Sequence, residues 1–421
     1  MRIRAVTYFV SLSDESELPS RLHEAALALE TCKAHLSRNL SLEVQTVRVA
    51  TNPFHLWAKP GSNDKAGWVA WARHMETLIV AEDLQFVSFG PCSSPDVAAF
   101  LPDMLAVTQH VSFSFRLDDP AWTTTETEPL PFLHSDLVEN SRLCGRLLLN
   151  IAKQTPGGNG NFRFAVLSGM EAKCPFFPAA YAASGQTPSI SIGLENSDWL
   201  HQAADTMESA ELDAGIVRGK YLLALQRIVH SEATRIEEAM LHFTMSYTAH
   251  SLEYSGLDTS IAPGLEAENA IMNAYQRIVP NIVLDSPGAV AITRSITAIL
   301  QSAPVLRVGY QGMMWAVLED PSLAALATSQ KLSFTSLLLH STVCGCGLDC
   351  VPFYVAEEEE SGEGGGKFVQ AVADLYLDVH AMADKLQKPL SARLFPVLDR
   401  QNDIIHFHSI YLQDCRPIQL L

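Results

Sequence analysis

Apolar residues alternate between two spacings along the first third of the chain. Residues 2–10 (RIRAVTYFV) form an apolar run typical of a buried strand, and residues 18–36 then carry apolar side chains at helical spacing. Residues 42–50 (LEVQTVRVA) again have the pattern of a strand, and the alternation continues over residues 65–117. Because strands and helices that alternate in this way form βα units, we predict an α/β fold around a largely parallel sheet.

The same alternation reaches the end of the chain. Residues 211–251 have the pattern of one very long helix or of two joined helices, and residues 388–397 (KPLSARLFPV) that of a late strand. Since there is no short internal repeat and no clear linker, we predict a single domain over residues 1–421, and about ten βα repeats would suit a barrel. Residues 356–366 are acidic and rich in glycine, which predicts a mobile surface loop.

Composition narrows the class of protein. The chain is 48% hydrophobic and 18% charged, so it can bury a large core. Its formal charge of −18, from 29 Lys and Arg against 47 Asp and Glu, argues against nucleic acid or an anionic membrane as a partner. No stretch reaches the roughly 18 to 20 apolar residues that span a bilayer. The 8 cysteines without a secretory signal indicate reduced thiols, and we expect a cytoplasmic protein.

The densest candidate for chemistry is residues 341–353 (STVCGCGLDCVPF). Glycines flank Cys346 and let backbone N–H groups approach a ligand, so Cys344 or Cys346 could be a thiol nucleophile or acid/base, with Asp349 beside it. Three cysteines at this spacing, with Cys350 as the third, could instead bind a metal. A tight turn with small buried cysteines is the structural alternative.

Charged residues in strand-like apolar runs are a second signal, because a buried charge must be paired or serve a ligand. Arg163 and Glu195 lie in such runs, in the segment that begins at Asn161. Glu195 could be a general base, or it could form an internal ion pair, for example with Arg163. Arg393 could hold a substrate carboxylate or phosphate through two hydrogen bonds, or form a structural salt bridge.

Two histidines near the C-terminus are a third signal. His406 and His408, in IIHFHSIY, would point to the same face of a strand and could bind a divalent metal. No third ligand is evident in the sequence, and such residues also face solvent or complete a core.

Several motifs together give a resemblance that runs over most of the chain. NFRFAVLSGMEAKCPFFPAAY, SISIGLEN, GLDTSIAPG, STVCGCGLDCVPF and KPLSARLFPV occur in the order found in domain-of-unknown-function family 711, which this chain resembles. The resemblance implies a ten-stranded α/β barrel similar to that of pyruvate formate-lyase, with the CGCGLDC segment as the counterpart of its inner loop. It implies no particular reaction, because the family has no established one.

The chain also departs from these relatives. VLRVGYQG (305–312) differs from the glycyl-radical signature in spacing and position, which disfavours a radical mechanism. Family members often have a histidine after PAAY, where this chain has Ala182, and a threonine at the position of Cys346. A histidine-dependent mechanism is therefore in doubt here.

We thus predict a non-radical enzyme, of lyase or isomerase type, that acts on a small polar, carboxylate-bearing metabolite inside the barrel. The alternatives are a metal-dependent hydrolase or oxidoreductase that uses a divalent metal, and a non-catalytic small-molecule-binding protein. No cofactor is firmly implied, and a homodimer is compatible with the sequence. The candidate site residues are, for catalysis, Cys344, Cys346, Asp349 and Glu195; for substrate binding, Arg393, Arg163, Asn161 and Asp258; and for a metal, His406 and His408.

Overall fold

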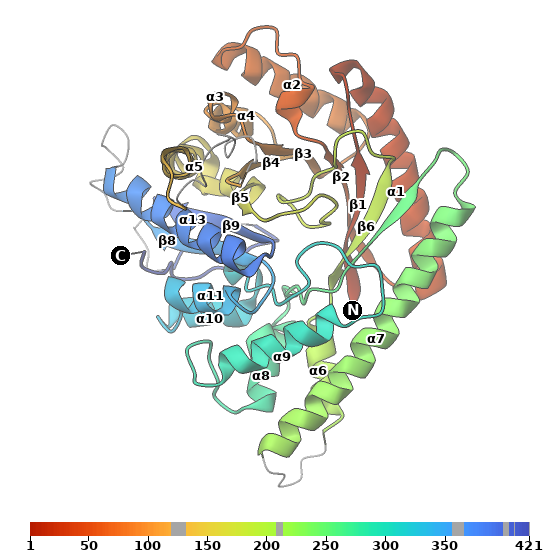
Figure 1. The fold of residues 1–421 in the computed structure, drawn as a ribbon, viewed down its shortest axis with the longest axis vertical. Helices are drawn as coiled ribbons and strands as arrows, with labels where there is room; N and C mark the ends of the chain where they lie inside the picture. Colours follow the sequence, from red (N-terminus) through yellow and green to blue (C-terminus); the bar gives the residue numbers. More distant parts are fainter. Residues whose placement is uncertain (119–131, 208–213, 356–365, 399–403, 408, 421) are drawn as a thin grey trace.

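One nine-stranded sheet lies at the centre of the fold (Figure 1). The computed structural model describes residues 1–118, 132–207, 214–355, 366–398, 404–407 and 409–420. The strands lie in the order β7-β6-β1-β2-β3-β4-β5-β9-β8. Their bounds are β1 Arg2–Val10, β2 Val44–Thr51, β3 Val87–Cys92, β4 Val111–Arg116, β5 Phe164–Ser168, β6 Ser189–Glu195, β7 Glu253–Asp258, β8 Gly347–Tyr354 and β9 Leu390–Val397.

The sheet is parallel in its middle and reverses direction at two places. β1 to β5 are parallel, β6 is antiparallel to β1, and β9 is antiparallel to β5. β7 is parallel to β6 and β8 is parallel to β9. The sheet therefore joins strands from both ends of the chain, which brings β1 and β9 into one layer.

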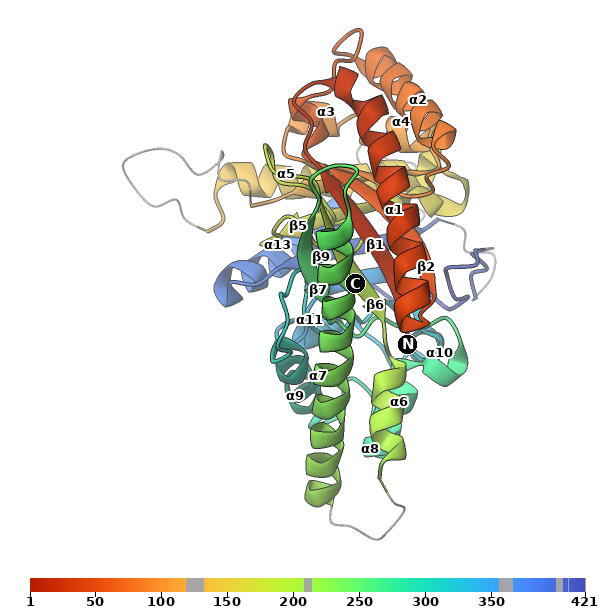
Figure 2. The ribbon, with the colours of Figure 1, turned by 90° about the vertical axis from the view of Figure 1, so that its right-hand side faces the viewer.

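Helices cover one face of this sheet, which we call the outer face. α1 and the long α7 lie side by side over the β1, β2 and β7 end (Figures 1 and 2), and α5 and α13 pack together near β9. The predicted long helix is confirmed, as one helix. The helix bounds are α1 Leu18–Leu40, α2 Lys65–Ala81, α3 Pro95–Ala98, α4 Leu101–Ala106, α5 Ser135–Gln154, α6 Asp198–Asp205, α7 Ala214–Ser246, α8 Ile271–Ile278, α9 Ala289–Gln301, α10 Pro321–Thr328, α11 Phe334–Ser341 and α13 Gly366–Leu386.

The opposite, inner face is covered by the connection between β5 and β6, residues 169–188, which we call the inner loop. Thr7 Oγ1 donates to the carbonyl of Pro175 at 2.8 Å, and Ser88 Oγ donates to that of Ala180 at 2.8 Å. Apolar residues of the loop pack on Phe9 and Ala50, apart from the core beneath the helices. Because both faces are covered, nearly every residue of β1 and β3 is buried, including the polar Thr7 and Ser88.

The predicted α/β class is confirmed, but the predicted ten-stranded barrel is not. The nine strands of the described chain form a sheet that does not close. Within the described chain, residues 305–316 form no strand and make only isolated bridges, including Leu257 with Arg307 and Ala316 with Asp349. The physical reason is local, since Gly309 (φ 75°) and Gln311 (φ 55°) adopt left-handed backbone conformations that interrupt an extended chain.

The prediction that CGCGLDC forms an inner loop is also wrong, because residues 347–350 belong to β8. The glycines of this motif allow backbones to pack closely. A Cβ on Gly345 would lie 3.0 Å from the nitrogen of Gly312, and one on Gly347 would lie 2.3 Å from the carbonyl oxygen of Ser391. The motif that covers the inner face is instead CPFFPAAY.

Three further predictions concern the acidic loop, the number of domains and membrane-spanning segments. Residues 356–365 of the predicted mobile loop lie outside the described residues, and the prediction of one domain stays a prediction. Across the described parts of the chain, no helix is both long enough and apolar enough to span a bilayer.

The packing at Gly347 can be tested by Gly347→Ala. An alanine at φ 86° lowers the free energy of unfolding by about 1–2 kcal/mol. The collision of its Cβ with Ser391 lowers it by about another 1–3 kcal/mol. Gly185→Ala is the matched control, because Gly185 has a similar φ of 74° but no atom within 4 Å of the point where a Cβ would lie. Urea unfolding should show a clearly larger loss of stability for Gly347→Ala; equal losses would contradict the packing argument.

Candidate functional site

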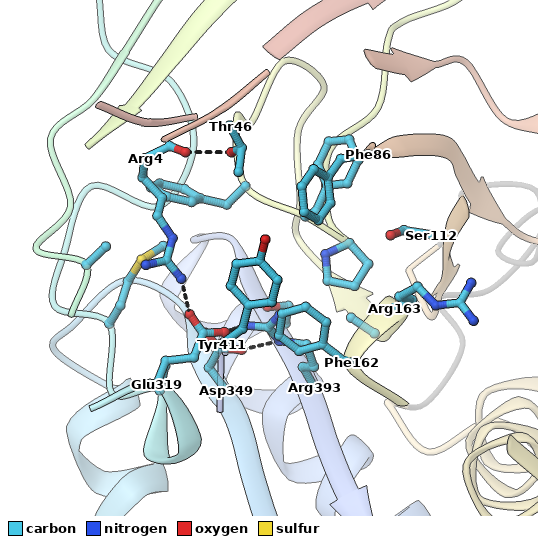
Figure 3. Close-up of a pocket in the computed structure, with 18 of the residues that line it drawn as sticks. Arg4, Thr46, Phe86, Ser112, Phe162, Arg163, Glu319, Asp349, Arg393 and Tyr411 are labelled. Carbon is cyan, nitrogen blue, oxygen red and sulfur yellow. Dashed lines mark hydrogen bonds and ion pairs between the residues drawn. The ribbon is translucent and has the colours of Figure 1, made fainter. Parts of the chain in front are cut away.

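A cavity lies on the inner face, between the sheet, the inner loop and the C-terminal segment, by which we mean residues 404–407 and 409–420 (Figure 3). The centres of water molecules can occupy ≈ 70 Å³ of it. Because one water needs about 10–15 Å³ by this measure, the cavity holds several waters or a ligand of a few heavy atoms. Its lining is rich in charge, with Arg4, Arg48, Arg163, Glu319, Asp349 and Arg393.

One wall of the cavity is an ion-pair cluster around Glu319, the last residue of a short 3₁₀ turn (Val317–Glu319). Arg393 on β9 donates from Nε to Asp349 Oδ1 at 2.7 Å and from Nη2 to Glu319 Oε1 at 2.6 Å. Arg4 on β1 donates from Nη2 to Glu319 Oε2 at 2.5 Å, and these contacts are among the dashed lines in Figure 3. Glu319 therefore connects arginines from opposite ends of the sequence.

The cluster extends from Arg4 to the edge of the site through Glu195 on β6. Arg4 Nη1 lies 2.8 Å from Glu195 Oε2, and Arg2 Nε donates to Glu195 Oε1 at 2.8 Å. Glu195 is only 4% exposed, and a buried carboxylate needs a partner of opposite charge. The two guanidinium groups supply it.

The two carboxyl groups that share Arg393 differ in acidity. Burial raises the pKa of Asp349; the Arg393 charge opposes this, whereas the negative charge of Glu319 adds to it. Burial alone would also raise the pKa of Glu319, but Arg393 and Arg4 outweigh it and lower that pKa. Neighbouring carboxyls with pKa values shifted in opposite directions form an acid/base arrangement.

A distortion of β8 places Asp349 at the cavity. The pairing of β8 with β9 shifts register between Leu348 and Val351, and Cys350 has a left-handed φ of 44°. Bulges re-aim side chains, and a non-glycine residue in this region is strained by about 1–3 kcal/mol. The strand therefore departs from regular geometry at the residue that follows Asp349.

Arg48, on β2, lines the cavity but, like Arg163, is not part of the ion-pair cluster. It is 8% exposed, its Nε donates to Thr46 Oγ1 at 2.9 Å, and its Cζ lies 5.4 Å and 5.2 Å from the ring centroids of Phe86 and Phe177. Among the described residues, no carboxylate is bonded to it. Burial, and then the charge of Arg4, lower its pKa to about 9, although the charge of Glu319 raises it in part, so the guanidinium stays charged at neutral pH.

The cysteines predicted as nucleophiles are not among the residues that line the cavity. Cys344 and Cys346 are 2% and 1% exposed. Burial raises the pKa of Cys344 to about 11 and that of Cys346 well above its ordinary value. A thiolate is the reactive form of cysteine, so these surroundings do not activate either thiol.

Glu195 and Arg163 do not pair with each other as the sequence suggested they could. Glu195 pairs with Arg2 and Arg4, as described above. Arg163 donates to the carbonyl oxygens of Val111 and Leu105 at 2.8 Å each, and Figure 3 shows its guanidinium directed away from the cavity. Arg163 therefore ties the start of β5 to β4 and α4.

Asn161 and Asp258, predicted to bind substrate, are buried outside the cavity lining. Asp258 accepts hydrogen bonds from the backbone N–H groups of Tyr310 and Gln311, at 2.8 Å and 3.2 Å. Its position therefore supports a structural role, in which it holds the turn that carries the Tyr310 side chain to the cavity.

The histidine pair is described only in part. His406 is exposed and lies 2.7 Å from Asp414 through Nδ1, while His408 lies outside the described residues. Within the parts of the chain that the structure covers, no three histidine, cysteine or acidic side chains are grouped so that they could hold a metal ion.

Sequence reasoning missed Arg4, Arg48 and Glu319. Arg4 and Arg48 carry the same signal that pointed to Arg393, a charge inside an apolar strand. Glu319 had no such signal, because it lies in a turn and its importance comes only from its distant partners.

The fold and site together define an α/β protein with a buried, arginine-rich cavity, and comparison with known proteins supplies the family. The family described as "Uncharacterised ACR (DUF711)" matches residues 1–408, and the chain belongs to it, as the sequence predicted. A UPF0210 protein of Pyrobaculum arsenaticum is 23% identical over 421 residues, covering 94% of this chain and 85% of the relative. UPF0210 proteins of Pyrobaculum islandicum (23% over 381 residues, 86% and 75% covered) and Desulfovibrio desulfuricans (24% over 219 residues, 50% and 47% covered) are also similar. None of these descriptions states an activity.

The opposed pKa shifts predict opposed pH dependences of stability. The folded state raises the pKa of Asp349. The contribution of Asp349 to the free energy of unfolding is therefore fully present below its ordinary pKa of about 4, and it is lost as the pH rises through the raised pKa. The pKa of Glu319 is lowered in the folded state. Its contribution to the free energy of unfolding is therefore fully present above its ordinary pKa, and it is lost as the pH falls through the lowered pKa.

Asp349→Asn should therefore gain thermal stability relative to the wild type as the pH rises from acid to neutral, whereas Glu319→Gln should lose it. Melting temperatures of the three proteins across that range are the measurement, and shifts common to other carboxyls cancel in the differences. Parallel pH profiles for the two variants would contradict the assignment of opposite shifts.

Proposed function

We propose that this chain is an enzyme that binds a small carboxylate-bearing metabolite in the cavity and transfers a proton on it, as a lyase or an isomerase does. The observation that carries the proposal is the buried guanidinium of Arg48, which lines the cavity without a carboxylate partner among the described residues. A buried charge without a counter-ion costs stability. A ligand with a negative charge would offset that cost.

The geometry of Arg48 favours a carboxylate. Its Nε is used by Thr46, so its Nη1 and Nη2 groups remain for a ligand. Their parallel N–H bonds match the two oxygens of a carboxylate. Phosphate carries more charge and more oxygens, and the neighbouring guanidinium groups of Arg4 and Arg393 are already bonded to protein carboxylates. The small volume of the cavity also favours a small acid.

The acid/base group of the proposed reaction is Asp349. Its raised pKa keeps it able to give or take a proton nearer to neutral pH than an ordinary aspartate. Glu319, with a lowered pKa, stays ionised and fixes Arg4 and Arg393 in place. A carboxylate held by Arg48 and a proton-transfer group in the same cavity suit removal or addition of a proton next to the carboxylate.

A non-catalytic binding protein is the second candidate, and one observation favours it. Asp349 is held by Arg393 at 2.7 Å, which limits its freedom to meet a substrate. The Asp349→Asn variant separates the two candidates: an enzyme would lose turnover and keep ligand affinity, whereas a binding protein would keep its biological activity.

Ligand affinity tests the role of Arg48 directly. Acetate, pyruvate, oxalate and succinate would be titrated into the protein by calorimetry, with inorganic phosphate as the competing anion. Hydrogen bonds between charged groups contribute about 1.5–3 kcal/mol, so Arg48→Met should weaken the bound acid at least about tenfold. Arg48→Lys keeps the charge and loses the paired N–H groups, and an intermediate affinity is expected.

Three outcomes would count against the proposal. They are wild-type affinity in Arg48→Met, tighter binding of phosphate than of every carboxylate, and failure of the wild type to bind any of the four acids.

A further inference from the structure

The C-terminal segment supplies a wall of the cavity that no strand supplies. Tyr411 of this segment lines the cavity together with Arg48 and Asp349. The segment is anchored beyond Tyr411 at two points: Gln413 N donates to the carbonyl of Leu318, directly before Glu319, at 2.6 Å, and Ile418 forms a bridge with Phe353 on β8. Tyr411 is therefore held against the ion-pair cluster by backbone contacts.

The ring of Tyr411 lies between Arg48, which has no carboxylate partner among the described residues, and Arg393, which is paired with carboxylates. It stacks on Phe162 at 6.2 Å with an interplanar angle of 13°, and it meets Phe86 edge to face at 6.4 Å. Phe86 lies 5.4 Å from the Cζ of Arg48, and Phe162 lies 5.0 Å from that of Arg393. Tyr411 therefore stands between the guanidinium without a carboxylate partner and the one that is paired.

The hydroxyl of Tyr411 is the part of this side chain that packing does not explain. Within the described chain it has no hydrogen-bond partner, and the side chain is only half-buried. Figure 3 shows it directed away from Glu319 and Asp349, toward the side of the cavity where Arg4 and Phe86 lie. The other tyrosine of the lining, Tyr310, differs because its hydroxyl bonds to Ser391 Oγ at 2.8 Å.

We infer that Tyr411 is a further ligand-binding residue, whose hydroxyl donates a hydrogen bond to the carboxylate-bearing ligand held by Arg48. This inference rests on the proposed function and adds the C-terminal segment to the binding site. A phenol hydroxyl that donates to a charged ligand oxygen contributes to the affinity for the ligand, and it does not contribute to the stability of the ligand-free protein. Stacking on Phe162 fixes the ring, so little conformational entropy is lost when the ligand binds.

Tyr411→Phe tests the inference, because it removes the hydroxyl and keeps the ring and its stacking. The same four carboxylates are titrated into the wild type, Tyr411→Phe, Arg48→Met and Ile410→Ala. Ile410 is the matched control, since it is the neighbouring residue and is 80% exposed. We expect Tyr411→Phe to weaken binding about tenfold with an unchanged melting temperature, and Ile410→Ala to bind like the wild type.

The outcomes separate this inference from the proposed function. If Tyr411→Phe binds like the wild type while Arg48→Met loses affinity, the role of Tyr411 is overturned and the carboxylate site stands. If Tyr411→Phe melts lower and its affinity falls only in proportion, the hydroxyl is structural and the inference is likewise overturned. If the wild type binds none of the four acids, or if both variants bind them normally, both claims fail.

Discussion

The burial of three guanidinium groups on the inner face of one sheet is the constraint on which the site depends. Two of these groups, Arg4 and Arg393, are compensated: they share Glu319, and each has a second carboxylate of its own. Arg48 lies beside them with only a threonine and two aromatic rings. Buried charges are retained only where something offsets their desolvation, so the difference between paired and unpaired arginines identifies the part of the cavity left for a ligand.

The topology of the sheet makes this arrangement possible. β1 and β9 come from opposite ends of the chain, and the reversals of direction at β6 and β9 place both in the same layer as the parallel centre. Glu319 then joins Arg4 to Arg393 across 315 and 74 positions of sequence respectively. The close backbone contact at Gly347 and the bulge near Cys350 bring Asp349 to the same point. Packing on the two faces of the sheet differs accordingly, with the buried sides of the helices outside and a cavity that contains charged side chains inside.

Much of the fold could be predicted from the sequence, because its elements depend on local patterns. Apolar periodicity was sufficient for the α/β class and for the long α7 helix. The failure to close a barrel depended on left-handed conformations at Gly309 and Gln311, and the second of these has no obvious sequence signal. Likewise, glycine spacing around Cys346 was compatible with a ligand loop or with close backbone packing, and only the structure distinguishes them.

Two signals in the sequence pointed to the site: the glycine-rich cysteine motif, which gave Asp349, and charges that interrupt apolar strands. The second signal found Arg393 and applied equally to Arg48, but the sequence does not tell which buried arginine has a carboxylate partner. Pairing is a long-range property: the sequence offers Arg163 as one possible partner of Glu195, whereas the sheet brings Glu195 to Arg2 and Arg4. Fold class therefore followed from the sequence, and the distribution of charge within the cavity did not.

The central claim is that the charge of Arg48 is uncompensated in the ligand-free protein, and thermal unfolding of two arginine variants without ligand tests it most directly. Arg48→Met should raise the stability of the empty protein by at least about 1 kcal/mol, because a buried unpaired charge is replaced by an apolar side chain of similar length. Arg393→Met should lower it by about 3–5 kcal/mol, because Asp349 and Glu319 lose their shared partner. If Arg48→Met is destabilised as strongly as Arg393→Met, then Arg48 is a structural residue and the account is contradicted.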